Sequence, residues 1–176
     1  KIISVLTIEN SNLAVDLAKC LFDSGIRNLE ITLRTKETKK ATELIINTNL
    51  DFNIGIGTVL TKDDLSFAKN IGANFALSPK TDIELIKESF KIDYKFIPGV
   101  SSSTDINTSK ILGCKILKLF PTIQLGGLTY FKSIYSPSKS SDLKFIALGG
   151  INDKNVKDFL KNELFIGVGA SWIATK

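Results

Sequence analysis

The chain contains no histidine among its 176 residues, and this absence excludes more chemistry than any other feature of the composition. Without imidazole there can be no Ser-His-Asp or Cys-His catalytic group, no histidine-ligated zinc and no histidine acting as a general base. Any catalysis must therefore use the side chains of Glu, Asp, Lys, Tyr or Cys.

Cysteine and methionine are also scarce. The two cysteines, Cys20 and Cys114, are too few for a disulfide framework and lack the spacing of metal ligands. The absence of methionine, with a start at Lys1, indicates that residues are missing or removed at the N-terminus. No apolar run approaches the roughly 18 residues of a membrane span, and no signal-peptide pattern opens the chain. We therefore expect a soluble cytoplasmic protein without a metal site.

Arginine is rare, and lysine supplies nearly all of the positive charge. The net charge is +5, yet Arg27 and Arg34 are the only arginines. The lysines are scattered along predicted helices, many of them beside acidic residues, and do not form a basic stripe with exposed aromatic side chains. This pattern argues against nucleic-acid binding. The charge can still steer an anionic substrate toward a site.

Short apolar runs alternate with amphipathic stretches along the whole chain. The runs predict strands, and the stretches between them carry helix signals. The predicted strands span residues 2–8, 27–33, 53–57, 74–78, 94–98, 115–120, 143–148 and 164–168. Strands and helices that alternate with short loops predict parallel βαβ units, and eight such strands favour a closed (β/α)8 barrel over an open sheet. We expect one α/β domain, a TIM barrel, over residues 1–176.

Capping residues mark the starts of several predicted helices. The predicted caps are Ser11, Thr61, Thr81 and Asn152, the last of them for a helix over 153–161. Thr61 and Thr81 each have an acidic residue three positions later, which is the capping-box pattern.

The predicted strand 27–33 places polar side chains on a single face. Glu30, Thr32 and Arg34 share that face, and apolar residues occupy the alternate positions. Inside a barrel, a carboxylate and a guanidinium are costly unless they are paired or used. A structural Glu30–Arg34 salt bridge is one interpretation. Because the chain uses lysine almost everywhere else, an arginine at 34 favours a planar group that binds a carboxylate.

The predicted strand 115–120 places Lys118 between apolar neighbours. Burial favours the neutral form of an amine, and a neutral amine can attack a ketone to form a Schiff base. The alternative is a lysine that extends along the strand edge to water. That alternative suits Lys115, at the strand entrance, better than Lys118.

Glycines gather at the ends of predicted strands. The segment 55–60 begins like a dinucleotide-binding fingerprint, but Leu60 stands where a third glycine is required. Its glycines are better explained by an open barrel interior, with the Thr58 hydroxyl at the mouth. Two glycine turns, at 149–150 and 167–171, follow the last two predicted strands. Backbone N–H groups at such turns bind phosphate, although tight turns alone would have the same sequence.

Seven motifs occur along the chain in an order and spacing that resemble one family, the 2-keto-3-deoxy-6-phosphogluconate (KDPG) and 4-hydroxy-2-oxoglutarate (KHG) aldolases. The resemblance covers residues 5–172. The motifs are LEITLRT (29–35), GIGTVL (55–60), LSP (77–79), IPGVSS (97–102), LKLFP (117–121), ALGGI (147–151) and GVGASW (167–172).

The resemblance implies a role for each site residue. Lys118 would form the carbinolamine and the imine, and Glu30 would transfer protons. Arg34 and Thr58 would hold the pyruvate carboxylate. The pocket around it would be shaped by Pro79 and Phe120, and the phosphate would be held by Gly149, Gly150, Gly169, Ala170 and Ser171. The resemblance also implies a homotrimer that acts on small molecules in the Entner–Doudoroff pathway, with no cofactor.

Some positions differ from the family pattern. Lys80 stands where glycine is common, Leu148 where threonine is common, and Ser4 begins a segment where proline often leads. Residues 122–125 replace a small polar loop. These differences lie in the outer pocket rather than at the amine. The terminal helices typical of the family are lacking, because only residues 173–176 follow the last predicted turn.

The expected activity is reversible cleavage of 2-dehydro-3-deoxy-6-phosphogluconate to pyruvate and glyceraldehyde 3-phosphate. Alternative substrates are the galactonate epimer and 4-hydroxy-2-oxoglutarate. A non-catalytic barrel that binds a phosphorylated metabolite is a different class of protein, but it would leave Glu30, Arg34 and Lys118 unexplained. A nucleic-acid-binding module is a third possibility, which no motif supports.

Overall fold

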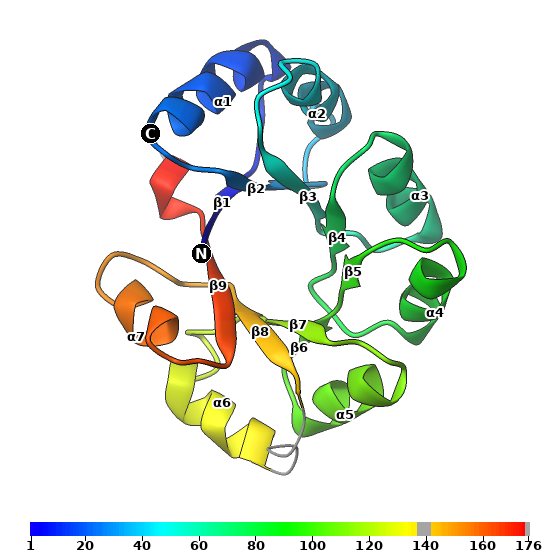
Figure 1. Cartoon of the computed structure of the whole chain (residues 1–176), viewed down its shortest axis with the longest axis vertical. Coiled ribbons are helices and arrows are strands. Elements are labelled where there is room, and N and C mark those ends of the chain that lie inside the picture. The colour runs from blue at the N-terminus through cyan, green and yellow to red at the C-terminus, as the bar shows by residue number, and fades with distance from the viewer. Residues whose placement is uncertain (137–141, 175–176) are drawn as a thin grey trace.

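The computed structural model describes residues 1–136 and 142–174. Its parallel strands surround a central axis, and the helices lie outside them (Figure 1). The strands are β1 (Ile2–Leu6), β2 (Asn28–Thr32), β3 (Asn53–Gly57), β4 (Phe75–Leu77), β5 (Phe96–Ile97), β6 (Gly99–Val100), β7 (Ile116–Leu119), β8 (Lys144–Ala147) and β9 (Phe165–Ala170). The helices are α1 (Ala14–Asp23), α2 (Thr38–Ile46), α3 (Lys62–Asn70), α4 (Ile83–Lys91), α5 (Ser103–Ile111), α6 (Gly127–Tyr135) and α7 (Val156–Leu160), with 3-10 turns η1 (Ser11–Leu13) and η3 (Trp172–Ala174). The predicted (β/α)8 TIM barrel is confirmed.

The sheet order shows how the barrel closes. The strands pair in the order β5-β4-β3-β2-β1-β9-β8-β7-β6, so the two ends of the sheet are β5 and β6. These strands are consecutive in the chain and separated only by Pro98, which has no N–H to donate to a ladder. The carbonyl of Pro98 accepts a hydrogen bond of 2.9 Å from the Lys118 amide. The predicted fifth strand, over 94–98, is observed only as β5 (Phe96–Ile97), and a second short strand, β6, follows Pro98.

Two layers of apolar side chains form the core. A small cluster fills the barrel interior, and its buried members are Ile3, Phe75, Leu77, Ile97, Ile146 and Leu148. A larger cluster lies between the strands and the helices and includes the fully buried Leu29 and Ile31 of β2. The alternation predicted for β2 is thus confirmed for its apolar face. The interior cluster makes the barrel a packed core rather than a pore.

The start of α3 has the predicted capping box. The Thr61 hydroxyl accepts from the amide of Asp64, and the Asp64 carboxylate accepts from the amide of Thr61, both at 3.1 Å. Such reciprocal bonds satisfy two backbone donors that the first helical turn leaves free. The Thr61 prediction is confirmed.

Two of the other predicted caps are displaced by one residue. Asn10, not Ser11, caps the first turn by accepting from the Asn12 amide at 3.0 Å. Asp82, not Thr81, caps α4, because the Thr81 hydroxyl donates instead to a backbone carbonyl of β6 at 2.7 Å. The hydroxyl had a tertiary partner that the local pattern could not reveal.

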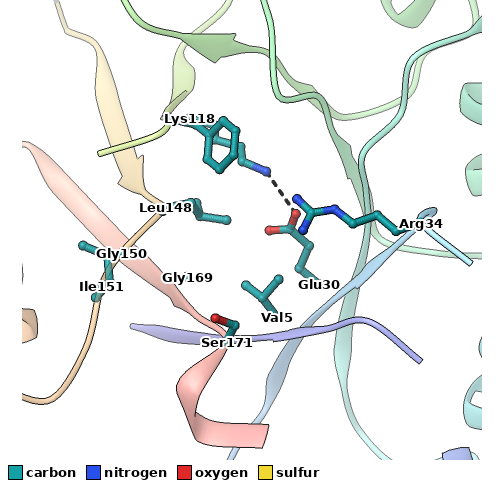
Figure 2. Close-up of a pocket in the computed structure, with 11 residues that line it drawn as sticks. Val5, Glu30, Arg34, Lys118, Leu148, Gly150, Ile151, Gly169 and Ser171 are labelled. Atoms are coloured by element: carbon teal, nitrogen blue, oxygen red, sulfur yellow. Dashed lines mark hydrogen bonds and ion pairs between the residues drawn. The ribbon is translucent and has the colours of Figure 1, made fainter. Parts of the chain in front are cut away.

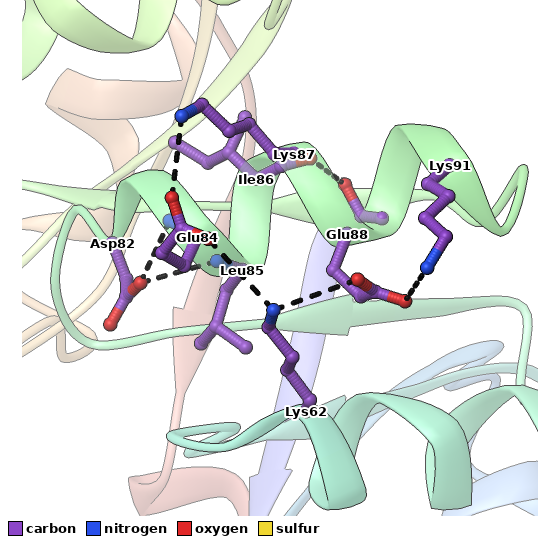
Figure 3. A network of polar contacts seen from close by, with 9 residues as sticks. Lys62, Asp82, Glu84, Leu85, Ile86, Lys87, Glu88 and Lys91 are labelled. Carbon is purple, nitrogen blue, oxygen red and sulfur yellow. Dashed lines mark hydrogen bonds and ion pairs between the residues drawn. The ribbon is translucent and has the colours of Figure 1, made fainter.

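Surface lysines of α3 and α4 pair with acidic residues, as predicted (Figure 3). Lys62 of α3 lies 3.8 Å from Glu84 and 3.7 Å from Glu88, which themselves pair with Lys87 and Lys91. Exposed pairs of this kind contribute only about 0–1 kcal/mol each. The lysines therefore form a solvated mixed-charge surface on these helices. None of the helices in residues 1–136 and 142–174 has the length and apolar character needed to cross a membrane.

Candidate active site

A cavity of about 160 Å³ opens where the C-terminal ends of several barrel strands meet. Side chains and backbone of segments far apart in the sequence form its wall. The lining residues are Val5, Glu30, Arg34, Lys118, Phe120, Leu148, Gly149, Gly150, Ile151, Gly169 and Ser171. Eight of the eleven predicted site residues are among them, and three are not: Thr58, Pro79 and Ala170. Active sites of TIM barrels lie at this end of the strands.

The chemical centre of the cavity is a buried pair of opposite charges (Figure 2). The Lys118 Nζ lies 3.0 Å from the Glu30 Oε1, and the two residues are 3% and 1% exposed. The other carboxylate oxygen, Oε2, is buried without a hydrogen-bond partner among the described residues. An unpaired buried acceptor is costly, so this oxygen is available to a partner that enters the cavity. The alternative interpretation, a structural Glu30–Arg34 salt bridge, is wrong, because the ion-pair partner of Glu30 is Lys118.

Glycines of β3 create the space that Glu30 occupies. A Cβ on Gly57 would lie 2.2 Å from the Glu30 Oε1, and a Cβ on Gly55 would lie 2.2 Å from the Phe75 ring. Both distances are far below van der Waals contact, so any side chain here would displace its neighbour. The prediction that these glycines keep the barrel interior open is wrong, because the Phe75 ring fills the space beside Gly55 and the Glu30 carboxylate fills the space beside Gly57.

Arg34 and Thr58 lie together at the mouth of the cavity, just beyond β2 and β3. The Arg34 Nε donates to the Thr58 Oγ1 at 3.3 Å, and the other guanidinium nitrogens have no hydrogen bond to a described residue. Thr58 has a φ of 61°, a left-handed conformation that costs energy for a β-branched residue. The pair holds the guanidinium beside the cavity, with most of its donors available to an anion.

The first predicted glycine turn is present between β8 and α7. Gly149 and Gly150 have φ angles of 95° and 76°, which favour glycine. Their amides donate no hydrogen bond to any residue within the described ranges, so both are available to an anion. The Asn152 side chain accepts from the Lys154 amide at 3.0 Å, as its predicted capping role requires, but the helix begins only at Val156, so the predicted range 153–161 is too long. Any anion site here therefore depends on the turn itself rather than on the adjacent helix dipole.

The second predicted glycine turn is wrong. Residues 167–170 belong to β9, because β1 pairs with them: Ile3 lies opposite Gly169, and Ser4 opposite Ala170. Ala170 is 1% exposed and does not line the cavity. Only Ser171 follows the strand, and its exposed side chain lies at the cavity wall.

Three apolar lining residues were not predicted as site residues. Val5 shares the inward face of β1 with Ile3, a signal that the alternation in the sequence contains. Leu148 and Ile151 flank the glycine turn on either side, and only their position next to that turn could have identified them.

The predicted site residue Pro79 packs against the backbone of β6: a Cβ on Gly99 would lie 2.4 Å from the Pro79 carbonyl carbon.

The other candidate nucleophiles lie outside the cavity. Burial raises the pKa of the Cys114 thiol to about 11, which leaves little thiolate near neutral pH. Lys115 is exposed and lies 3.0 Å from Asp142, so its predicted surface role is confirmed. Within residues 1–136 and 142–174, Lys118 is the lysine that lines the cavity.

A TIM barrel whose cavity buries an amine against a carboxylate has the groups that a Schiff-base lyase requires, and known proteins share its fold and about a third of its sequence. The family model described as "Aldolase: KDPG and KHG aldolase" matches residues 1–176. The chain belongs to the KDPG and KHG aldolase family and is a lyase.

Individual relatives agree with this assignment. The 2-dehydro-3-deoxy-phosphogluconate aldolase of Treponema pallidum is 31% identical, over 98% of this chain and 81% of the relative. The KHG/KDPG aldolase of Escherichia coli K12 is also 31% identical, over 98% and 80%. A crystal structure of KDPG aldolase from Legionella pneumophila, with pyruvate captured as a covalent carbinolamine, is 38% identical with a TM-score of 0.91, covering 98% of this chain and 82% of that chain.

Proposed function

We propose that this protein cleaves 2-dehydro-3-deoxy-6-phosphogluconate reversibly to pyruvate and glyceraldehyde 3-phosphate through a Schiff base on Lys118. The observation that carries the proposal is the 3.0 Å contact between the Lys118 amine and the Glu30 carboxylate, both buried in the cavity. This pair gives one site both a nucleophile and a proton acceptor. A coupled assay tests the proposal: the enzyme should release pyruvate and glyceraldehyde 3-phosphate in equal amounts, and the absence of both products would refute it.

Lys118 forms the covalent intermediate in this mechanism. Lys118 first loses one proton, and its neutral amine attacks the C2 ketone carbon. The oxygen of the resulting carbinolamine takes up a proton from solvent and leaves as water, which gives an iminium ion. Glu30 accepts the proton of the C4 hydroxyl as the C3–C4 bond breaks. The electrons of that bond move into the iminium, which releases the aldehyde and leaves an enamine. Glu30 then returns a proton to C3, and water hydrolyses the iminium to free pyruvate and Lys118. The iminium is the electron sink, so the sequence of steps calls on no cofactor.

The two ends of the substrate need different partners. Arg34, held by Thr58, would bind the carboxylate next to the reacting ketone, where a guanidinium can make two parallel hydrogen bonds. Phe120 lies beside the amine, with Lys118 Nζ 5.2 Å from its ring centroid, and would shape the pyruvate pocket together with Pro79. The free amides of the Gly149-Gly150 turn, with Gly169 and Ser171 at the end of β9, would hold the phosphate; Ala170, which does not line the cavity, would not contact it.

Ser171 offers the cleanest test of the phosphate site. Larger residues at Gly149 or Gly150 would collide with Pro121 or Ile123, where an added Cβ would lie 2.9 and 2.7 Å from the nearest atoms. The exposed Ser171 side chain can be replaced without such a clash. Ser171→Glu should repel the phosphate and raise KM for the phosphorylated substrate at least about tenfold, with little change for 4-hydroxy-2-oxoglutarate.

Ser171→Gln is the matched control, because it has the same size without the charge. It should change KM much less than Ser171→Glu does. Equal losses on both substrates in the Glu variant would mean that no phosphate binds here. An enzyme specialised for unphosphorylated 4-hydroxy-2-oxoglutarate would then be the better proposal.

We also propose that the enzyme acts in the cytoplasm as a homotrimer, as the family resemblance implies. Exposed apolar side chains of α4 and its neighbour α5 support association: Phe90 is 56% exposed and Ile111 is 75% exposed. Surfaces of this kind are typical of contacts between subunits. Light scattering after size exclusion should give three times the chain mass of 19.3 kDa, and a mass of one chain would contradict the trimer.

A further inference from the structure

The cavity is lined by polar side chains at its two ends and by apolar side chains between them. Four of the lining side chains are polar or charged: Glu30, Arg34, Lys118 and Ser171. The first three gather at the amine, and Ser171 lies at the end of β9. Figure 2 shows Leu148 between Lys118 and Gly150, and it shows Val5 between Glu30 and Ser171. We call Val5 and Leu148 the apolar belt.

The backbone around Leu148 fixes this residue in place. Its amide donates to the Leu119 carbonyl at 3.0 Å, and its carbonyl accepts from the Thr122 amide at 2.7 Å. The side chain is 3% exposed and fills the space above Gly169, where an added Cβ would lie 2.4 Å from the Leu148 Cγ. The Leu148 side chain is therefore packed at the cavity wall on a backbone held by hydrogen bonds on both sides.

The proposed function determines which substrate atoms meet the apolar belt. With C2 on Lys118 and the phosphate on the glycine turn, the atoms between them are C3, C4 and C5. The C4 hydroxyl loses its proton to Glu30 in the reaction. The C5 hydroxyl takes no part in the chemistry and lies next to the phosphate-bearing carbon, where Val5 and Leu148 offer neither a donor nor an acceptor.

We propose that Leu148 and Val5 leave the C5 hydroxyl without a hydrogen-bond partner. The enzyme then accepts either configuration at C5, or no hydroxyl there, with similar kcat/KM, and recognises its substrate through the carboxylate and the phosphate. This inference rests on the proposed function. A site that hydrogen-bonds a substrate hydroxyl rejects the analogue without it by about 10⁴–10⁵-fold, because its own polar groups are left unpaired. An apolar wall has no such groups and discriminates weakly. In the synthetic direction, the C5 hydroxyl is the 2-hydroxyl of the acceptor aldehyde.

Aldol addition of pyruvate to three acceptors tests the proposal: D-glyceraldehyde 3-phosphate, its L enantiomer and 3-oxopropyl phosphate, which lacks the hydroxyl. The two enantiomers have the same intrinsic reactivity, so their ratio reports on the cavity alone. We expect kcat/KM to differ by less than about tenfold among the three. A larger preference for one enantiomer, or a larger rejection of 3-oxopropyl phosphate, would overturn the inference.

A pair of variants of equal shape tests the role of Leu148. Leu148→Thr supplies a hydroxyl where Leu148→Val supplies only a methyl group, so any general loss of packing is common to both. Relative to the Val variant, the Thr variant should change the enantiomer ratio by about tenfold or more. An unchanged ratio would show that Leu148 does not face this hydroxyl. If the wild type prefers one enantiomer and Ser171→Ala removes that preference, Ser171 recognises the hydroxyl and the inference fails.

Borohydride reduction in the presence of pyruvate distinguishes failure of the apolar-belt proposal from failure of the proposed aldolase function. A label on Lys118 together with strong enantiomer discrimination would refute the apolar belt and leave the aldolase intact. If Lys118 takes no label, the proposed function fails first.

Discussion

Replacement of Lys118 by alanine should abolish cleavage of 2-dehydro-3-deoxy-6-phosphogluconate, with kcat lower by on the order of 10⁶-fold, the scale seen when a covalent nucleophile is removed. Among the residues that the structure describes, Lys118 alone of the lysines lines the cavity, so none of the other described lysines is placed to form the imine. The measurement is steady-state release of pyruvate. A variant with more than a small percentage of wild-type activity would contradict the assignment of Lys118 as the nucleophile.

The alanine variant also leaves the Glu30 carboxylate buried without its cation, which costs about 3–5 kcal/mol for a buried pair. Lys118→Arg therefore serves as a second variant, since it retains a cation for Glu30 but cannot form a Schiff base. Urea unfolding shows whether each variant is folded. Lys115→Ala, at an exposed position three residues earlier on the same segment, should keep full activity.

Glu30→Gln should still bind pyruvate covalently but should lose most proton transfer. Glutamine can accept a hydrogen bond from Lys118 in the place of Oε1, yet it cannot take a proton from C4 or return one to C3. Loss of a general acid–base residue lowers the rate by about 10²–10⁴-fold. Exchange of deuterium from solvent into the pyruvate methyl group measures this step alone, because the exchange needs the imine and the base but no aldehyde.

Glu37→Gln is a suitable control for the Glu30 variant. Glu37 lies just beyond the cavity residue Arg34 in the chain, where its carboxylate accepts from the Ser11 amide at 3.3 Å. This variant should exchange deuterium at the wild-type rate. If Glu30→Gln also exchanges at that rate, Glu30 is only the structural partner of Lys118, and another group must move the protons.

The periodicity of the sequence was sufficient to predict the barrel and the chemical centre. Apolar residues alternate in β2, and that alternation placed Glu30 on the inward face. The apolar neighbours of Lys118 placed it within a buried strand. The 3.0 Å contact between Lys118 and Glu30 was not predictable. The two residues are 88 positions apart, and nothing in the local pattern shows how β2 and β7 face each other across the barrel.

Several of the errors come from contacts between segments that are distant in the sequence. The Thr81 hydroxyl donates to the Gly99 carbonyl of β6 instead of capping α4. Residues 167–170 form a strand rather than a turn because β1 lies beside them. In the sequence, Leu148 is notable only as a difference from the family pattern. Its position in the cavity wall depends on its packing against Gly169, which the sequence does not show.

Mass spectrometry after borohydride reduction with pyruvate tests the central claim most directly. Reduction of the imine makes the bond between the enzyme and pyruvate permanent, and peptide mapping then identifies the residue. The account predicts one reduced pyruvyl group per chain, on Lys118, and none in Lys118→Ala. A label on Lys115 or Lys80, which both pair with aspartates at the surface, or no label at all, would contradict it.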